Sequence, residues 1–84
     1  MSTERTMKMG QLAELQEQLR RLENRADGIL GNIRLEAMPA PLSGPFDLDA
    51  QRIRDYADEF LGVSGEGRRV LAAIDKLKGE LGLA

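Results

Sequence analysis

The apolar residues in the first half of the chain recur at alternating steps of three and four. Between residues 12 and 33 they form one series, Leu12, Leu15, Leu19, Leu22, Ala26, Ile29 and Ile33. This spacing places a single apolar seam along one side of a helix, as in a coiled coil or a long bundle helix. Because a lone helix cannot bury such a seam, these seven residues are the predicted oligomer seam.

The pattern predicts one long coiled-coil-like helix over residues 11–37. Gly10 weakens an earlier start, so residues 1–10 are predicted to be a polar N-terminal lead-in. Pro39 disfavours the helical conformation at Met38 and sets the end. From Ala26 onward the apolar stripe widens as Leu30 joins it, and a wider stripe should receive more than one neighbouring helix.

Residues 38–47, with the sequence MPAPLSGPFD, are the predicted Pro/Gly-rich linker. Pro39, Pro41, Gly44 and Pro45 are incompatible with a regular helix there. A rigid turn is the favoured interpretation, and the alternative is an extended Pro-x-Pro strip for an aromatic groove.

The rest of the chain, residues 48–84, is predicted to form a pair of short helices. The first covers about 48–61, with Asp49 as its N-cap, Asp47 as the competing cap and Gly62 as its stop. A flexible joint at 62–66 separates it from a helix that ends near Leu81. The predicted core of the pair is Ile53, Ala57, Phe60, Leu61, Val70, Leu71, Ile74, Leu77 and Leu81.

The predicted fold is therefore all-α, with one long coiled-coil-like helix followed by two shorter helices in an oligomeric helical bundle. Two short helices would cover only the wide half of the long one, which leaves the narrow seam of 12–22 for a second chain. A homodimer is the predicted assembly. The charges beside the seam do not choose between parallel and antiparallel association.

Composition supports dependence on a partner. The 84 residues include two Phe, one Tyr and no Trp, so little aromatic area is available for a core. With no Cys and no His, neither a disulfide nor the common zinc sites can stabilise so small a domain. The missing cysteine and the lack of a long apolar run predict a cytoplasmic protein without a membrane segment.

Three groups of polar residues are candidate sites, and each has a simpler interpretation. Asp47 and Asp49 resemble the start of a calcium loop, but Arg52 replaces the required glycine, so capping is favoured. The glycines before Arg68 and Arg69 suggest a weak anion site at a helix start, against a plain flexible joint. Possible nucleic-acid contacts are weak: Arg20, Arg21, Arg25, Arg68 and Arg69.

The first three of these arginines alternate with glutamates at helical neighbour spacings, and the net charge is −2, so mutual screening is favoured over phosphate binding. Without His or Cys, no catalytic arrangement is evident, and no enzyme activity, cofactor or metal is expected. The predicted function is a non-enzymatic protein–protein interaction or structural module that self-associates through the seam and binds another protein. The alternative is a small nucleic-acid-associated regulatory protein that uses surface arginines.

Overall fold

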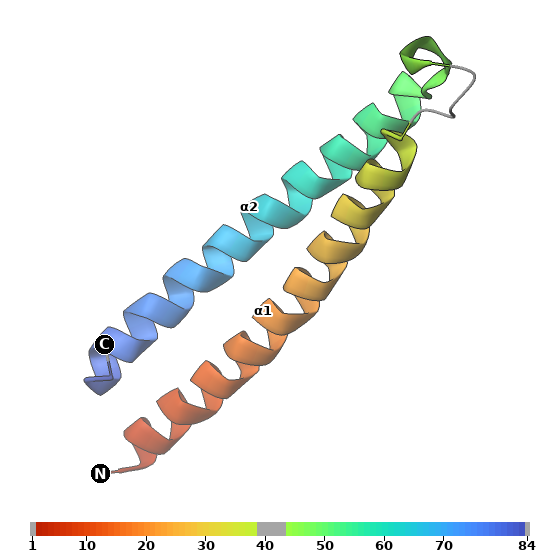
Figure 1. The fold of residues 1–84 in the computed structure, drawn as a ribbon. Helices are drawn as coiled ribbons and strands as arrows, with labels where there is room; N and C mark the ends of the chain where they lie inside the picture. Colours follow the sequence, from red (N-terminus) through yellow and green to blue (C-terminus); the bar gives the residue numbers. More distant parts are fainter. Residues whose placement is uncertain (1, 39–43, 84) are drawn as a thin grey trace.

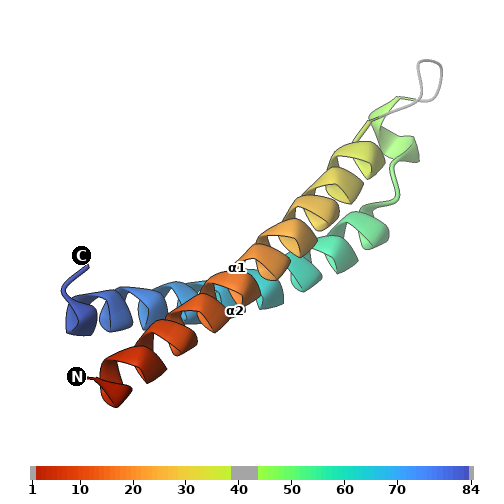
Figure 2. The ribbon, with the colours of Figure 1, turned by 90° about the horizontal axis from the view of Figure 1, so that it is seen from below.

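The computed structural model describes residues 2–38 and 44–83, and it is an extended hairpin of two long helices (Figure 1). Helix α1 covers Thr3–Glu36, a short 3-10 turn η1 covers Pro45–Asp47, and helix α2 covers Ala50–Leu81. The helices run antiparallel and side by side, so the two termini lie at the same end (Figures 1 and 2). The molecule measures 67 × 17 × 16 Å. The all-α prediction is confirmed, but the described chain is a two-helix rod rather than a compact bundle.

The predicted end of α1 is confirmed and its predicted start is wrong. The helix ends at Glu36, yet it begins at Thr3 and includes Gly10. The N-terminal turns are held by the far end of α2: Arg5 Nη1 donates to the Leu81 carbonyl at 3.2 Å. Because tertiary contacts of this kind outweigh the weak helix propensity of one glycine, the predicted polar lead-in is helical.

The predicted division of the second half into two short helices is also wrong, because α2 runs unbroken through 62–66. The helix continues because the apolar residues keep the same three–four spacing on both sides of residues 62–66, so one face of the helix packs against α1 throughout. Packing against α1 along this seam offsets the cost of about 1 kcal/mol that each interior glycine imposes. The seam of α2 consists of Ile53, Tyr56, Phe60, Val63, Gly67, Val70, Ile74, Leu77 and Leu81.

Both ends of α2 are capped by local chemistry. The carboxylate of Asp49 accepts a hydrogen bond from the backbone N–H of Arg52 at 3.0 Å, as predicted, while Asp47 lies in η1 instead. At the other end Gly82 has φ +72, and the Leu83 N–H donates to the Lys78 carbonyl at 2.8 Å. This is a Schellman motif, which needs a residue that tolerates positive φ.

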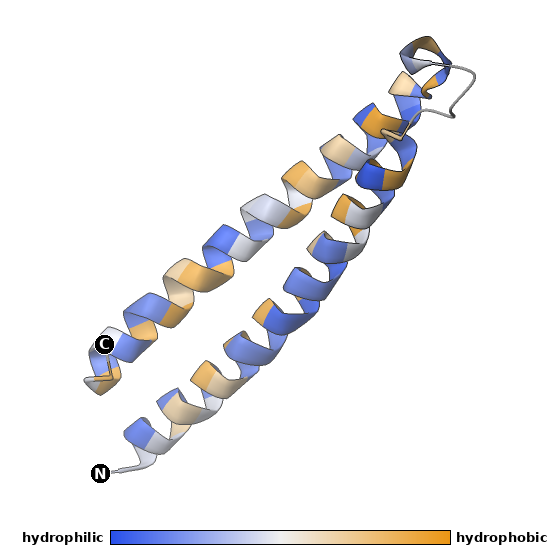
Figure 3. Cartoon of the chain, in the orientation of Figure 1, coloured by the Kyte–Doolittle hydropathy of each residue, from blue (hydrophilic) through white to orange (hydrophobic). Residues whose placement is uncertain are grey.

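The core lies between the helices, where apolar residues line the facing sides of both (Figure 3). Its main cluster consists of Leu12, Val70, Ile74, Leu77 and Leu81, with Leu15, Leu19 and Leu22 packed against it. Ile29 and Val63 are also buried. Of the predicted core residues, Ile53 and Phe60 are half-buried, whereas Ala57, Leu61 and Leu71 are exposed. These three residues lie beside the seam, because the constant three–four spacing of α2 turns Tyr56 and Val63 toward α1 instead.

The helix lengths therefore do not require a second chain to cover residues 12–22, contrary to what the sequence had indicated. The dimer itself remains a prediction. Helix α2 has 32 residues and α1 has 34, so one chain covers its own seam from end to end. The half-burial of Leu15, Leu19 and Leu22 shows that this cover is incomplete.

A glycine exchange tests the continuity of α2. A Cβ added at Gly62 meets nothing within 4 Å, so Gly62→Ala should stabilise the protein by up to about 1 kcal/mol in urea unfolding. Gly82→Ala is the control: its positive φ should make the same substitution destabilising by about 1 kcal/mol. A loss of stability at Gly62 would contradict an unbroken helix.

A second substitution tests the core. Ile74 is 5% exposed and belongs to the main cluster, so Ile74→Ala should cost about 2–5 kcal/mol. Leu35→Ala removes a side chain that is 70% exposed and should change the free energy of unfolding by about 0.5 kcal/mol or less. Equal effects of the two substitutions would contradict the observed packing.

Candidate functional site: two unequal edges of the hairpin

A two-helix seam is flanked by one row of residues from each helix on either edge, and the two edges of this hairpin differ in chemistry. The first is called the ion-pair edge. It consists of Glu4, Gln11, Gln18, Arg25 and Asn32 from α1, with Arg52, Glu59, Glu66, Ala73 and Glu80 from α2. Ala73 is its only apolar member, so water can solvate nearly all of these side chains.

Three ion pairs join the helices along this edge, one near each end and one in the middle. They are Lys8 Nζ to Glu80 Oε1 at 3.4 Å, Arg25 Nη2 to Glu59 Oε1 at 3.7 Å, and Arg52 Nε to Glu36 Oε1 at 3.4 Å. Exposed pairs contribute little stability individually, but opposite charges at these positions favour the observed antiparallel register.

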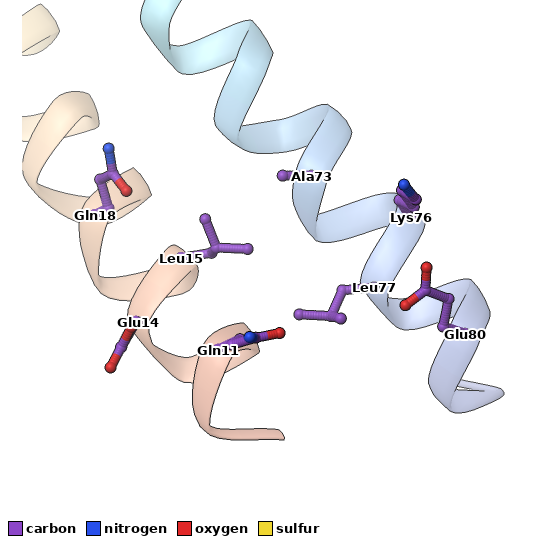
Figure 4. Close-up of a pocket in the computed structure, with 8 residues that line it drawn as sticks. All are labelled: Gln11, Glu14, Leu15, Gln18, Ala73, Lys76, Leu77 and Glu80. Carbon is purple, nitrogen blue, oxygen red and sulfur yellow. The ribbon is translucent and has the colours of Figure 1, made fainter. Parts of the chain in front are cut away.

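A groove of about 410 Å³ opens on the ion-pair edge toward the termini. Figure 4 shows Leu15 and Leu77 pointing toward each other from α1 and α2 at its floor. Its remaining lining is mostly polar: Gln11, Glu14, Gln18, Ala73, Lys76 and Glu80. Since water can solvate most of this lining, the groove does not require a covering partner.

The second edge, called the open edge, is much less polar. It consists of Met9, Gln16, Glu23, Leu30 and Ala37 from α1, with Ala57, Ser64, Leu71 and Lys78 from α2. Five of these nine are apolar. Within residues 2–38 and 44–83, no ion pair joins the two helices along this edge.

A groove of about 230 Å³ lies on the open edge near the middle of the rod. Its cause is Gly67, which occupies a seam position without a side chain and leaves Leu19 and Leu22 only half-covered. Leu71, which is 47% exposed, continues the apolar surface outward. The lining is Leu19, Leu22, Glu23, Ala26, Phe60, Val63, Ser64, Gly67, Arg68 and Leu71. Its chemistry suits an apolar side chain from a partner helix.

The arginines of α1 are engaged with acidic neighbours, as the screening interpretation predicted. Arg20 donates two hydrogen bonds to the Glu17 carboxylate, at 2.6 and 3.1 Å, and Arg21 lies 3.7 Å from it. The hydrogen bonds from Arg20 lower the pKa of Glu17, and the charges of Arg20 and Arg21 lower it further. Arg25 pairs with Glu59 across the seam. These arginines therefore present no unbalanced basic patch.

Neither interpretation of the glycine joint fits the structure: the favoured flexible joint is helical, and the alternative anion site required free backbone N–H groups at a helix start. Gly62, Gly65 and Gly67 lie in the interior of α2, where those groups belong to the helix ladder. The two arginines also diverge: Arg68 lines the groove of the open edge, whereas Arg69 lines a second hollow of about 340 Å³ on the ion-pair edge, beside Glu66 and Ala73.

The acidic residues that resembled a calcium loop are used locally. Asp49 caps α2, and Asp55 accepts a hydrogen bond from Gln51 at 2.8 Å. Over the part of the chain that the structure describes, no three His, Cys, Asp or Glu residues are grouped to hold a metal ion. In the same residues, neither helix has an apolar stretch that could cross a bilayer. The Pro39–Pro41 strip lies outside the described residues.

Comparison with known proteins adds no family: no protein-family model, curated protein or solved structure matches this chain. A functional proposal for this chain therefore rests on the geometry of the hairpin.

Sequence reasoning missed the asymmetry of the edges because it treated Gly62 as a stop. Three seam residues were left out of the predicted core: Tyr56, Val63 and Gly67. They continue the same three–four spacing that runs from Ile53 to Leu81. Extending the three–four count across the glycines would have identified both the single helix and the residues beside its seam.

The ion pair on α1 gives a pH-dependent prediction. Arg20→Gln should raise the pKa of Glu17 toward its ordinary value, because the hydrogen bonds that favour the carboxylate are lost. Glu17 contributes to stability above its unfolded pKa, and this contribution is lost as the pH falls through the folded value. Carboxyl NMR titration measures the pKa directly, and an unchanged value would mean that the pair does not form in solution.

Proposed function

We propose that this chain is a non-enzymatic helical-hairpin module of the cytoplasm that self-associates and, as an oligomer, organises or binds another protein. The observation that carries the proposal is the unfinished burial of its apolar residues. Only seven hydrophobic residues are buried in the described chain, and none is less than 2% exposed. A hairpin this thin leaves each seam covered from one side only.

The solvent-exposed area of the chain is larger than that of a compact protein of the same mass. The chain exposes 6310 Å², whereas a compact monomer of 9.3 kDa exposes about 5,000 Å². The excess of about 1,300 Å² is larger than the roughly 800 Å² that each partner buries in a standard interface. Burying one edge in a standard interface would therefore remove more than half of this excess.

The alternative, a nucleic-acid-associated regulator, has no comparable support. Arg20, Arg21 and Arg25 are paired with carboxylates, Arg68 and Arg69 lie beside different grooves, and the net charge is −2. Nucleic-acid binding depends on basic groups that are free to replace counterions. The arrangement of the charges therefore favours the interaction module.

The proposal predicts that the protein is a dimer or higher oligomer at micromolar concentration. Size-exclusion chromatography with light scattering should give a mass of at least twice 9.3 kDa, falling toward 9.3 kDa on dilution. A folded monomer that persists up to the highest soluble concentration would overturn it.

A further inference from the structure

We propose that the open edge is the self-association interface, and that two copies pack these edges together into a four-helix bundle. The inference rests on the proposed function. It adds which face of the hairpin associates, that a second copy of the chain covers it, and how the two copies are oriented. In a bundle of this kind each helix contacts two neighbours, and its apolar stripe must then be wider than a two-stranded seam.

The stripes of both helices are widened toward the open edge. Leu30 of α1 and Leu71 of α2 lie there directly beside seam residues, and Ala57 keeps the surface shallow enough for close approach. The same rows on the ion-pair edge are almost entirely polar, and Arg25 and Glu59 pair across that edge. A second hairpin packed on the open edge would fill the groove that lies beside Gly67.

The occupant is a second copy because the edge is self-complementary in charge. Its groove carries Glu23 on the α1 wall and Arg68 on the α2 wall, and both side chains are exposed. A symmetric dimer needs one patch that matches itself. With the two-fold axis along the rod, α1 of one copy lies over α2 of the other, which brings Glu23 near Arg68 of the second copy.

The other symmetric arrangement is disfavoured by like charges. A two-fold axis across the rod lays α1 over α1 and α2 over α2. That places each groove residue near its own equivalent, so Glu23 would face Glu23 and Arg68 would face Arg68. Juxtaposed like charges disfavour an interface, so the bundle should have both interhelical loops at the same end.

A pair of matched leucine substitutions tests the face. Leu71→Glu puts a charge on the open edge, whereas Leu35→Glu puts the same charge on a leucine that is 70% exposed and lies away from both grooves. Leu71→Glu should raise the dissociation constant of the dimer by a factor of about 30 or more, while Leu35→Glu leaves it unchanged. Circular dichroism of both variants checks that the helices remain.

The outcomes separate this inference from the proposed function. If the unsubstituted protein is a dimer and Leu71→Glu is one as well, the interface lies elsewhere and the inference fails alone. Equal weakening by both substitutions would also overturn it. An unsubstituted protein that stays monomeric overturns the proposed function and the inference together.

Charge exchange tests the arrangement. Glu23→Arg and Arg68→Glu should each weaken self-association, because each creates two like-charge contacts across the dimer. Mixing the two variants should restore dimers that contain one copy of each, measured with one variant carrying a mass tag. Since pairing within a single chain cannot be restored by mixing, an unrestored mixture would rule out contact between Glu23 and Arg68 across copies.

Discussion

The structure depends on how much surface two helices can cover for each other. A pair of packed helices encloses one line of contact, and every residue beside that line keeps one side in water. In this chain the line runs the full length of both helices, from Arg5 against the Leu81 carbonyl to Glu36 against Arg52. The seam is therefore paired from end to end within one chain, although Leu15, Leu19 and Leu22 stay half-buried and both edges face solvent.

The two edges of the hairpin are chemically unequal. One edge is lined mainly by charged and amide side chains, which water solvates well. The other carries five apolar residues, and one of them, Leu71, lines a groove that lies where Gly67 has no side chain. The groove has an apolar floor and a charged residue on each wall, Glu23 and Arg68.

Part of this architecture was predictable from the sequence. The seam of α1, its end before Pro39 and the cap at Asp49 follow from local rules on spacing, proline and side-chain acceptors. The start at Thr3 does not, because it depends on Arg5 and Lys8 reaching the far end of α2. The continuity of α2 was obscured by Gly62, Gly65 and Gly67. Their low helix propensity is outweighed by a seam whose phase persists for 29 residues from Ile53 to Leu81. The exposed positions of Ala57, Leu61 and Leu71 follow once that phase is known.

The central claim is that one chain closes its own seam as an antiparallel hairpin. Thr3 is the first residue of α1 and Asp75 lies in the last two turns of α2, and both are exposed, so spin labels at these positions measure this by pulsed electron resonance. The labelled chain is diluted with an excess of unlabelled chain, so that only distances within one molecule remain. The account predicts a distance well below the 67 Å length of the rod that survives dilution. A separation comparable to that length, or a short distance that disappears on dilution, would contradict it.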